Sequence, residues 1–380
     1  MSGRNHIIDA QRVLVKLGTQ VVTHDGAQLA LGRMMSVVED MARLRHAGRQ
    51  LVVVSSGAVA MGMRALDIRE RPSSLGLTQA CAAIGQGELI GLYQQAFGKL
   101  GLKTAQVLLS QEDLADRNRA LCLRTTLMRL LELGVVPILN ENDSVSVHEL
   151  VEDSAHAFGD NDELSARVAT SLNADLLILL TDVDGVYSQN PTTHHDAELF
   201  DVLEDIDDSL LEGAQGSSRA GKGGMASKLR AAKLAAESGT PVVIASGHTG
   251  NIVHRLFKGE QLGTLVTPAG QRGRRHQRIA ITRESRGALV VNGGALKALA
   301  DDKASLLPIG VVGVEGDFAQ GDVVEIRDDS GRLYGRGLVN YGSDECRKLM
   351  GQHSSQIDRI IGWRGYDALI TRLNLVMGRL

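Results

Sequence analysis

Short apolar runs alternate with longer stretches of helical periodicity over the first two thirds of the chain. The runs, several of which are apolar at every position, are Val13–Val15, Leu51–Val54, Val107–Leu109, Val135–Leu139, Leu176–Leu180 and Val242–Ala245. A strand that is buried on both faces has this pattern, and such strands occur in parallel sheets covered by helices. Apolar residues at helical spacing predict helices over Leu29–His46, Ala120–Leu133 and Ser227–Ser238. The alternation therefore predicts a three-layer α/β/α domain with a mostly parallel central sheet.

The pattern changes near residue 268. Residues 269–276 are polar, basic and glycine-containing, which is typical of a linker. Short β-like runs then lie between turn signals, at Ala288–Val291, Gly310–Val314, Asp322–Ile326 and Gly335–Val339. We therefore expect a first domain over residues 1–268, a linker over 269–276 and a small, mainly β domain over 277–380.

Composition and charge narrow the class of protein. The chain has 380 residues, a formal net charge of −4 and three widely separated cysteines. This length suits two domains, and the charge gives no indication of a nucleic-acid or anionic-membrane partner. Neither the cysteines nor the eleven histidines have a metal-binding spacing. Because the first ten residues lack a signal-peptide core and no apolar run approaches the roughly 18 residues of a membrane span, we expect a cytoplasmic protein.

Two segments that follow predicted strands have the composition of anion-binding sites. Ligands of parallel α/β sheets bind beyond the carboxyl ends of the strands. Lys16 leaves the first strand just before Gly18, so a fixed cation lies beside backbone N–H groups that suit a phosphate. Ser56 and Gly57 follow the second strand at the start of a helix and suit an anion such as a carboxylate. The alternatives are a lysine extending to solvent and an ordinary helix cap with a packing glycine.

Polar clusters follow the later strands. Asn140–Asp143 follows the fourth strand, and Thr181–Asp182 follows the fifth, shortly before an Asp-Gly pair that is typical of a tight turn. Gly159–Asp162 precedes the helical run Glu163–Ser171. One Asp or Asn would cap this helix, whereas three in succession suggest a further role, such as holding Mg²⁺ or orienting a lysine.

Gly221–Lys228 opens another predicted helix. Gly223 and Gly224 allow a phosphate to approach the backbone, and Lys228 lies in the first helical turn, where the helix dipole disfavours a cation unless an anion is bound nearby. The alternative is a flexible surface loop. The GxxxxGK spacing that ends at Lys222 is that of a P-loop, but Gly223 replaces the required Ser or Thr and no buried strand precedes it, so we reject a P-loop.

Taken in order, these segments resemble the amino acid kinase family. The resemblance rests on six segments, which are Val15–Thr19, Ser55–Val59, Asn140–Asp143, Gly159–Asp162, Leu180–Tyr187 and Gly223–Leu229. Ser305–Gly310 and Arg336–Tyr341 in the last part of the chain resemble a PUA domain, a small and mainly β barrel. Any one segment is weak, whereas six in order followed by this domain are specific and span nearly the whole chain.

The resemblance implies a function and a set of site residues. It implies ATP-dependent phosphorylation of the side-chain carboxylate of L-glutamate in proline biosynthesis, with Mg²⁺ carried mainly by the ATP phosphates, feedback inhibition by proline and a homo-oligomer. Lys16 and Lys228 would neutralise the transferring phosphoryl group, and Asp162 would hold the two lysines. Contacts with ATP are implied for Lys16, Gly18, Thr181, Asp182, Lys222, Gly223, Gly224, Met225, Ala226, Ser227 and Lys228, and contacts with glutamate for Ser56, Gly57, Asp143 and Asn161.

The sequence departs from the family pattern in places. Lys222 stands where Thr or Ser is usual, and the spacer over residues 144–158, which would border the glutamate and proline site, is longer than usual. Three alternatives stay open: a family member acting on N-acetylglutamate, UMP or an isoprenoid phosphate, an RNA-binding protein, and an inactive regulator. RNA binding predicts a basic domain with stacking aromatics, whereas residues 276–380 hold 14 Lys and Arg against 13 Asp and Glu.

Overall fold

The computed structural model describes residues 4–24, 28–70, 72–145, 161–191, 193–194, 196–214, 224–268, 285–301, 304–362 and 365–378. The chain divides into two compact units, Met1–Arg272 and Gly273–Leu380, and each is described by itself. The predicted linker over 269–276 and the predicted ATP contacts Lys222 and Gly223 lie outside the described residues. Among the described helices, none is both long enough and apolar enough to cross a membrane.

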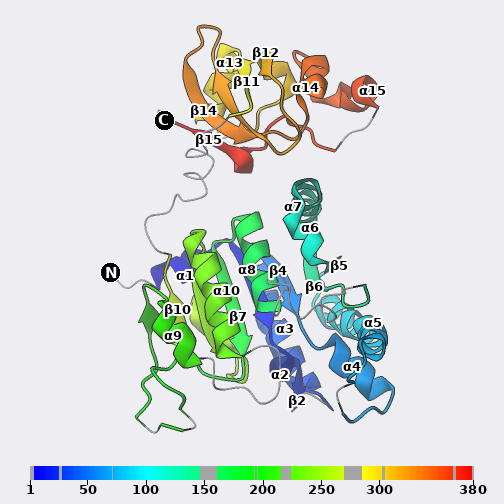
Figure 1. The fold of residues 1–380 in the computed structure, drawn as a ribbon, viewed down its shortest axis with the longest axis vertical. Helices are drawn as coiled ribbons and strands as arrows, with labels where there is room; N and C mark the ends of the chain where they lie inside the picture. The colour runs from blue at the N-terminus through cyan, green and yellow to red at the C-terminus, as the bar shows by residue number, and fades with distance from the viewer. Residues whose placement is uncertain are drawn as a thin grey trace. The chain divides into compact units, whose positions relative to one another are not determined.

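The first unit is built on an eight-stranded sheet (Figure 1). In spatial order, its described strands are β5 (Thr104–Leu109), β6 (Val136–Glu141), β4 (Gln50–Ser55), β1 (Arg12–Leu17), β7 (Leu176–Thr181), β9 (Val242–Ser246), β10 (Thr264–Val266) and β8 (Val202–Leu203). The ladders from β5 to β9 are all parallel, and β10 is antiparallel to β9. The six predicted strands and the mostly parallel sheet are confirmed, so the carboxyl ends of these six strands share one edge.

Helices cover both faces of this sheet, and each face has its own apolar core. One core contains residues of α1 (Asn5–Asp9), α3 (Leu31–His46), α4 (Ala58–Ala65), α5 (Leu75–Lys99) and α11 (Ile252–Phe257). The other contains residues of α7 (Arg117–Glu132), α8 (Asn161–Leu172) and α10 (Met225–Glu237). The remaining described elements are α2 (Thr19–Val22), the hairpin β2 (Thr23–His24) with β3 (Gln28–Leu29), α6 (Gln111–Ala115) and α9 (Asp208–Gly213). The three-layer prediction is confirmed, although the helix predicted from Leu29 begins at Leu31 because Leu29 belongs to β3.

α4 and α5 lie side by side with their backbones in contact (Figure 1). A Cβ atom added at Gly62 would lie 1.8 Å from the Cys81 carbonyl oxygen, and one added at Gly85 would lie 1.8 Å from the Ala58 carbonyl oxygen. Only glycine allows this approach at either position, because the atoms it meets belong to backbone that no rotamer change can move. The contact fixes the position of α5 relative to the start of α4.

Gly85→Ala is expected to destabilise the first unit by about 3 kcal/mol or more, since overpacking against backbone forces the two helices apart. Gly87→Ala on the same helix is the matched control, because a Cβ there would meet nothing within 4 Å. The control should raise stability by about 0.5–1 kcal/mol through helix propensity. Urea unfolding followed by circular dichroism measures both variants, and equal midpoints would contradict the packing argument.

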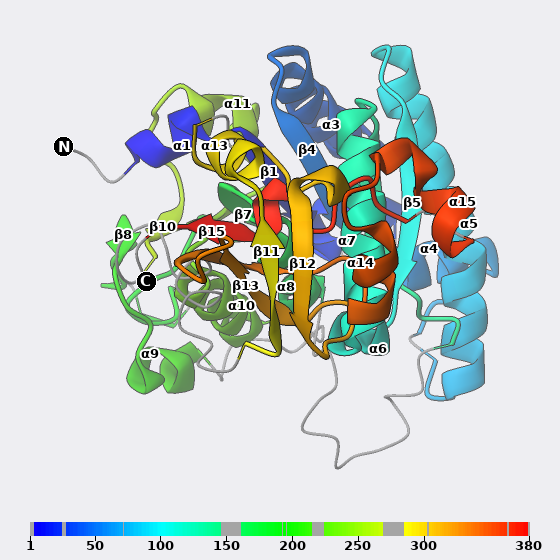
Figure 2. The same cartoon turned by 90° about the horizontal axis from the view of Figure 1, so that it is seen from above.

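The second unit holds a five-stranded sheet in the order β12 (Val311–Gly316), β11 (Gly287–Val291), β13 (Val323–Arg327), β14 (Leu333–Leu338) and β15 (Leu375–Met377). Its ladders are antiparallel except for the β11–β13 pair. The helices are α13 (Gly293–Asp301), α14 (Ser343–Leu349) beside β12, and α15 (Ile357–Ile361), with single 3₁₀ turns at Pro308–Gly310, Ser354–Gln356 and Arg372–Asn374 (Figure 2). A separate apolar core with the buried Tyr341 fills this unit, and the mainly β prediction is confirmed.

Candidate active site

Lys16 reaches the α8 and α10 side of the sheet because side chains alternate along β1. Val13, Val15 and Leu17 enter the core on the α3 and α5 side, whereas Leu14 enters the core on the opposite side. Lys16 shares the orientation of Leu14 near the carboxyl end of the strand. An apolar residue would be the usual choice at a position only 2% exposed, so a lysine there indicates a specific partner.

The partner of Lys16 is Asp162, in the first turn of α8. Lys16 Nζ lies 2.6 Å from Asp162 Oδ1, and Lys228 Nζ, from the first turns of α10, lies 3.3 Å from Asp162 Oδ2. The Asp162 side chain is fully buried, and both lysines are nearly so. The structure thus brings together three residues that lie up to 212 positions apart in the sequence. We call Lys16, Asp162 and Lys228 the charged trio.

The charged trio holds two ammonium groups and one carboxylate, so it has a formal charge of +1 when all three groups are ionised. Ser227 donates a further hydrogen bond of 3.0 Å to Asp162 Oδ2. Ser165 donates to the Asp162 backbone carbonyl at 2.6 Å and fixes the first turn of α8. Buried ammonium groups attract an anionic ligand strongly, because burial weakens the screening by water that would otherwise reduce the attraction.

Backbone from three elements surrounds the charged trio. Gly18 donates its N–H to the Leu180 carbonyl oxygen at 3.0 Å, and a Cβ added at Gly18 would lie 3.9 Å from Lys16 Nζ. Thr181 is buried at the end of β7, and its hydroxyl donates to the exposed Asp182 at 2.9 Å. Gly224 is the N-cap of α10, and Met225, Ala226 and Ser227 form its first turn. The described residues of the predicted ATP set therefore lie on elements that meet at one edge of the sheet.

Asn161, next to Asp162 in sequence, connects the charged trio to a second set of polar residues. Its Nδ2 donates to the Ser55 carbonyl oxygen at 3.0 Å, to Ser56 Oγ at 3.1 Å and to Asn140 Oδ1 at 2.9 Å. Gly57 has a φ of +104°, a left-handed conformation that favours glycine, and it forms the N-cap of α4. Asn161 thus joins the ends of β4 and β6 to the start of α8. Asp143 lies in the turn after β6 and is half-buried.

Two residues of α5 complete this polar set, and neither is among the residues that the sequence predicts. Gln86 Oε1 accepts a 2.7 Å hydrogen bond from Asn140 Nδ2, and the Tyr93 hydroxyl lies 2.9 Å from Ser55 Oγ. Burial raises the pKa of Tyr93 to about 12, so its hydroxyl stays protonated at neutral pH. Gln86 and Tyr93 are seven positions apart, which places them on the same side of α5. No motif surrounds either residue in the sequence, so their role follows only from the fold.

The described residues do not build a dedicated metal site. Among them, no three His, Cys, Asp or Glu side chains are grouped so that they could hold a metal ion. The buried carboxylate at the site, Asp162, is engaged by Lys16, Lys228 and Ser227. The two ammonium groups and the hydroxyl around Asp162 suit an anion such as a nucleotide phosphate.

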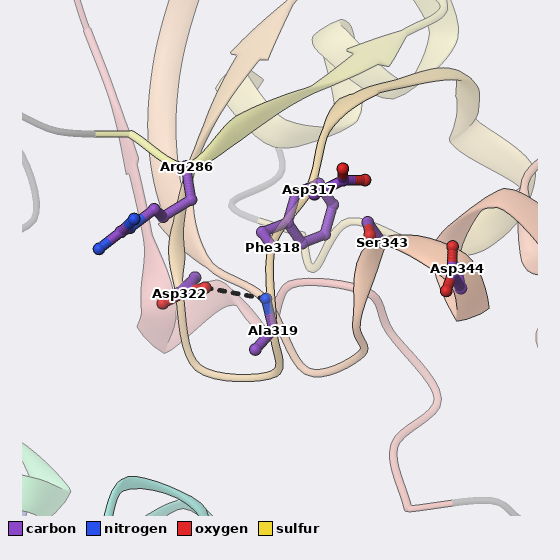
Figure 3. Close-up of a pocket in the computed structure, with 7 residues that line it drawn as sticks. All are labelled: Arg286, Asp317, Phe318, Ala319, Asp322, Ser343 and Asp344. Carbon is purple, nitrogen blue, oxygen red and sulfur yellow. Dashed lines mark hydrogen bonds between the residues drawn. The ribbon is translucent and has the colours of Figure 1, made fainter.

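A pocket of about 610 Å³ lies in the second unit (Figure 3). It is lined by Arg286, Asp317, Phe318, Ala319, Asp322, Ser343 and Asp344. The Arg347 guanidinium bridges two of its carboxylates, at 2.9 Å from Asp317 and 2.8 Å from Asp344. Three carboxylates against one arginine in the lining disfavour a nucleic-acid phosphate, so this pocket gives no support to the RNA-binding alternative.

The parallel sheet and the cationic site beyond its strand ends define a phosphoryl-transfer enzyme, and the chain belongs to the amino acid kinase family. The profile of the Amino acid kinase family matches residues 11–246, and that of the PUA domain matches residues 287–361. Within the family, the chain is similar to proteins named Glutamate 5-kinase. It is 45% identical over 379 residues to the one from Marinomonas sp. (strain MWYL1), covering 99% of this chain and 100% of that protein. It is 43% identical over 371 residues to the one from Moorella thermoacetica, covering 97% and 96%.

Solved structures with a similar fold include a T. acidophilum isopentenyl phosphate kinase in complex with its product. That structure has a TM-score of 0.46 and 18% sequence identity, and the match covers 67% of this chain and 99% of that one.

Proposed function

We propose that the chain transfers the γ-phosphoryl group of ATP to the side-chain carboxylate of L-glutamate. The proposal rests on the charged trio, which offers a buried positive charge between β1, α8 and α10. The names of relatives that match over nearly the full length supply the acceptor. In the reaction, a carboxylate oxygen forms a bond to the γ-phosphorus while the bond from that phosphorus to the oxygen of ADP breaks.

The acceptor chemistry explains why the site needs no general base. A glutamate side chain has an ordinary pKa near 4.3, so it is already an ionised nucleophile at pH 7. Phosphoryl transfer then depends on in-line positioning and on stabilisation of charge at the phosphoryl oxygens. In our proposal, Lys16 and Lys228 stabilise that charge, and Asp162 holds the two ammonium groups at their separation. Mg²⁺ bound to the ATP phosphates would add further positive charge.

The remaining site residues take the roles that the family resemblance implies. Gly18, Thr181, Asp182 and residues 222–228 would contact ATP. Ser56, Gly57, Asp143 and Asn161 would contact glutamate at the ends of β4 and β6 and the start of α8. The substrate carries an ammonium group, for which Asp143 is a suitable counter-charge. N-acetylglutamate lacks that charge, so this arrangement favours free glutamate.

Several further properties belong to the proposal. They are feedback inhibition by proline, a homo-oligomeric assembly, a cytoplasmic location, and a kinase domain over residues 1–268 that a linker over 269–276 joins to a PUA domain over 277–380. The family resemblance implies inhibition by proline and the homo-oligomer, and the composition of the chain favours the location. The family matches over residues 11–246 and 287–361 support the division into two domains.

Trapping of the acyl phosphate with hydroxylamine tests the function. The purified full chain is incubated with ATP and Mg²⁺ and with L-glutamate, N-acetylglutamate, aspartate or UMP, and each reaction is followed by hydroxamate and ADP formation. We expect hydroxamate with L-glutamate alone and a lower rate when proline is added. Turnover of another acceptor but not of glutamate would overturn the substrate assignment, and no turnover with any acceptor would favour an inactive regulator or an RNA-binding role.

A further inference from the structure

Three side-chain amides form a directed chain from α5 to the proposed glutamate site. Asn161 Nδ2 donates to Asn140 Oδ1 at 2.9 Å, and Asn140 Nδ2 donates to Gln86 Oε1 at 2.7 Å. Each amide presents its oxygen to the NH₂ group of the next. Reversing one of them would place two NH₂ groups or two oxygens face to face, which removes a hydrogen bond and adds repulsion.

One end of this chain is anchored by backbone. The Ser55 carbonyl oxygen can only accept, and it receives Asn161 Nδ2 at 3.0 Å. Ser56 Oγ and Asn140 Oδ1 also accept from this NH₂ group, so its two N–H donors are shared among three acceptors. The three acceptors fix the plane of the Asn161 amide and turn its oxygen away from them. That oxygen, Oδ1, is buried and has no hydrogen-bond partner among the residues that the structure describes.

A buried acceptor without a partner is unfavourable unless a ligand supplies a donor. The ammonium group of an amino acid carries three N–H donors and no acceptor, so it matches a carbonyl-type oxygen and not an NH₂ group. If the Asn161 amide turned over, its NH₂ group would face the ammonium and repel it. The orientation of this amide therefore decides whether the site favours or disfavours a free amino group.

The other end of the chain depends on Gln86. Asn140 is 2% exposed, so water cannot readily replace a lost partner of its NH₂ group. Without the Gln86 oxygen, Asn140 has a buried donor with no acceptor and gains by rotating toward other oxygens. That rotation removes one of the three acceptors that orient Asn161 Nδ2. Gln86 is held in place by α5, whose backbone meets that of α4 at the neighbouring Gly85.

We propose that Gln86 is a positioning residue that sets the amide of Asn161, through Asn140, so that Oδ1 accepts a hydrogen bond from the substrate ammonium. The proposal rests on glutamate being the acceptor substrate. Gln86 connects to Asn161 through Asn140 and lies outside the charged trio. Its removal therefore acts on the binding of the amino acid and leaves the chemical step unchanged.

The test compares Gln86→Met with wild-type full chain in the hydroxamate assay. Methionine keeps the length and volume of glutamine and removes the acceptor. We expect the KM for glutamate to rise about tenfold while kcat and the KM for ATP stay within about twofold. Gln86→Glu keeps an oxygen facing Asn140 and should restore the KM to within about threefold of wild type. Gln94→Met, at an exposed position of the same helix, is the matched control and should leave all constants unchanged.

Glutarate separates an effect on the ammonium from a general disturbance of the site, because it keeps both carboxylates and lacks the amino group. Its inhibition constant against glutamate should be the same in wild type and in Gln86→Met. A parallel loss for glutarate, an unchanged KM for glutamate, or a failure of Gln86→Glu to restore it would overturn the proposal. Gln86→Ala, which removes the same acceptor and favours the helix, replaces Gln86→Met if that variant does not fold. Absence of glutamate turnover in wild type would instead overturn the proposed function.

Discussion

Lys228→Met is expected to abolish most of the turnover while the protein remains as stable as wild type or becomes more stable. The charged trio holds two ammonium groups for one carboxylate, so this substitution leaves a one-to-one pair of Lys16 and Asp162 at 2.6 Å. Replacing a buried charge with an apolar group of similar shape is often neutral or stabilising when the remaining charges are paired. Ser227 still donates to the Asp162 oxygen that Lys228 leaves.

Loss of one positively charged group that stabilises a transition state typically lowers kcat by about 10²–10³-fold, or about 3–4 kcal/mol. The hydroxamate assay at saturating substrates measures kcat, and thermal unfolding measures Tm. Lys233→Met on the same helix is the matched control, since Lys233 is partly exposed and 3.9 Å from Asp208. It should keep kcat within about twofold. Near-normal turnover in Lys228→Met would remove this lysine from the mechanism.

Asp162→Asn is expected to lower the stability of the protein, unlike Lys228→Met. It should lower turnover, as Lys228→Met does. The substitution removes the carboxylate that both nearly buried ammonium groups contact, and breaking a comparable buried pair costs about 3–5 kcal/mol. Turnover should fall by at least about 10³-fold, because both lysines lose the group that holds them. Glu39→Gln is the control, since this exposed carboxylate pairs with Arg43 at 3.3 Å on the surface of α3 and should change stability by less than about 1 kcal/mol.

A second measurement distinguishes loss of charge balance from general damage. ATP carries the negative charge that the Asp162→Asn site lacks, so its binding should raise the Tm of this variant more than that of wild type. Higher ionic strength should reduce that difference only slightly if the interaction is buried. An equal rise in Tm for both proteins would show that the charged trio does not face the nucleotide.

The hydrophobic pattern predicts the inner parallel strands of the first unit well because they are short, apolar and almost entirely buried. β5 at the sheet edge is only half-buried over most of its length. The pattern does not predict α5, which is apolar around much of its circumference and so lacks the one-sided pattern of a surface helix. β10 and β8 have only three and two residues, and their place depends on pairing with β9 and with each other. Local sequence carries little information about such contacts. The parallel β11–β13 pair in the second unit is non-local in the same way.

The residues of the candidate site also differ in how far the sequence indicates them. Lys16, Asp162 and Lys228 stand out in the sequence because they are charged residues at strand ends and helix starts, and the family resemblance implies their roles. Their mutual distances follow only from the fold. Gln86 and Tyr93 could not be identified, since a glutamine or a tyrosine within a helix has no motif around it, and their partners Asn140 and Ser55 are 54 and 38 positions away. Ser227 was predicted to contact ATP, and the structure adds its hydrogen bond to Asp162.

The placement of Lys16 on the central strand affects how the enzyme loses activity under stress. β1 is paired on both sides, with β4 and β7, so we expect Lys16 to lie in the part of the first unit that opens last. Fraying of the edge strand β5 or of β8 leaves the charged trio assembled. Mild heating, or a destabilising mutation far from the site, should therefore reduce the number of active molecules and leave the specific activity of each folded molecule unchanged. In a cell, such a mutation would act on enzyme abundance through degradation of the unfolded chain.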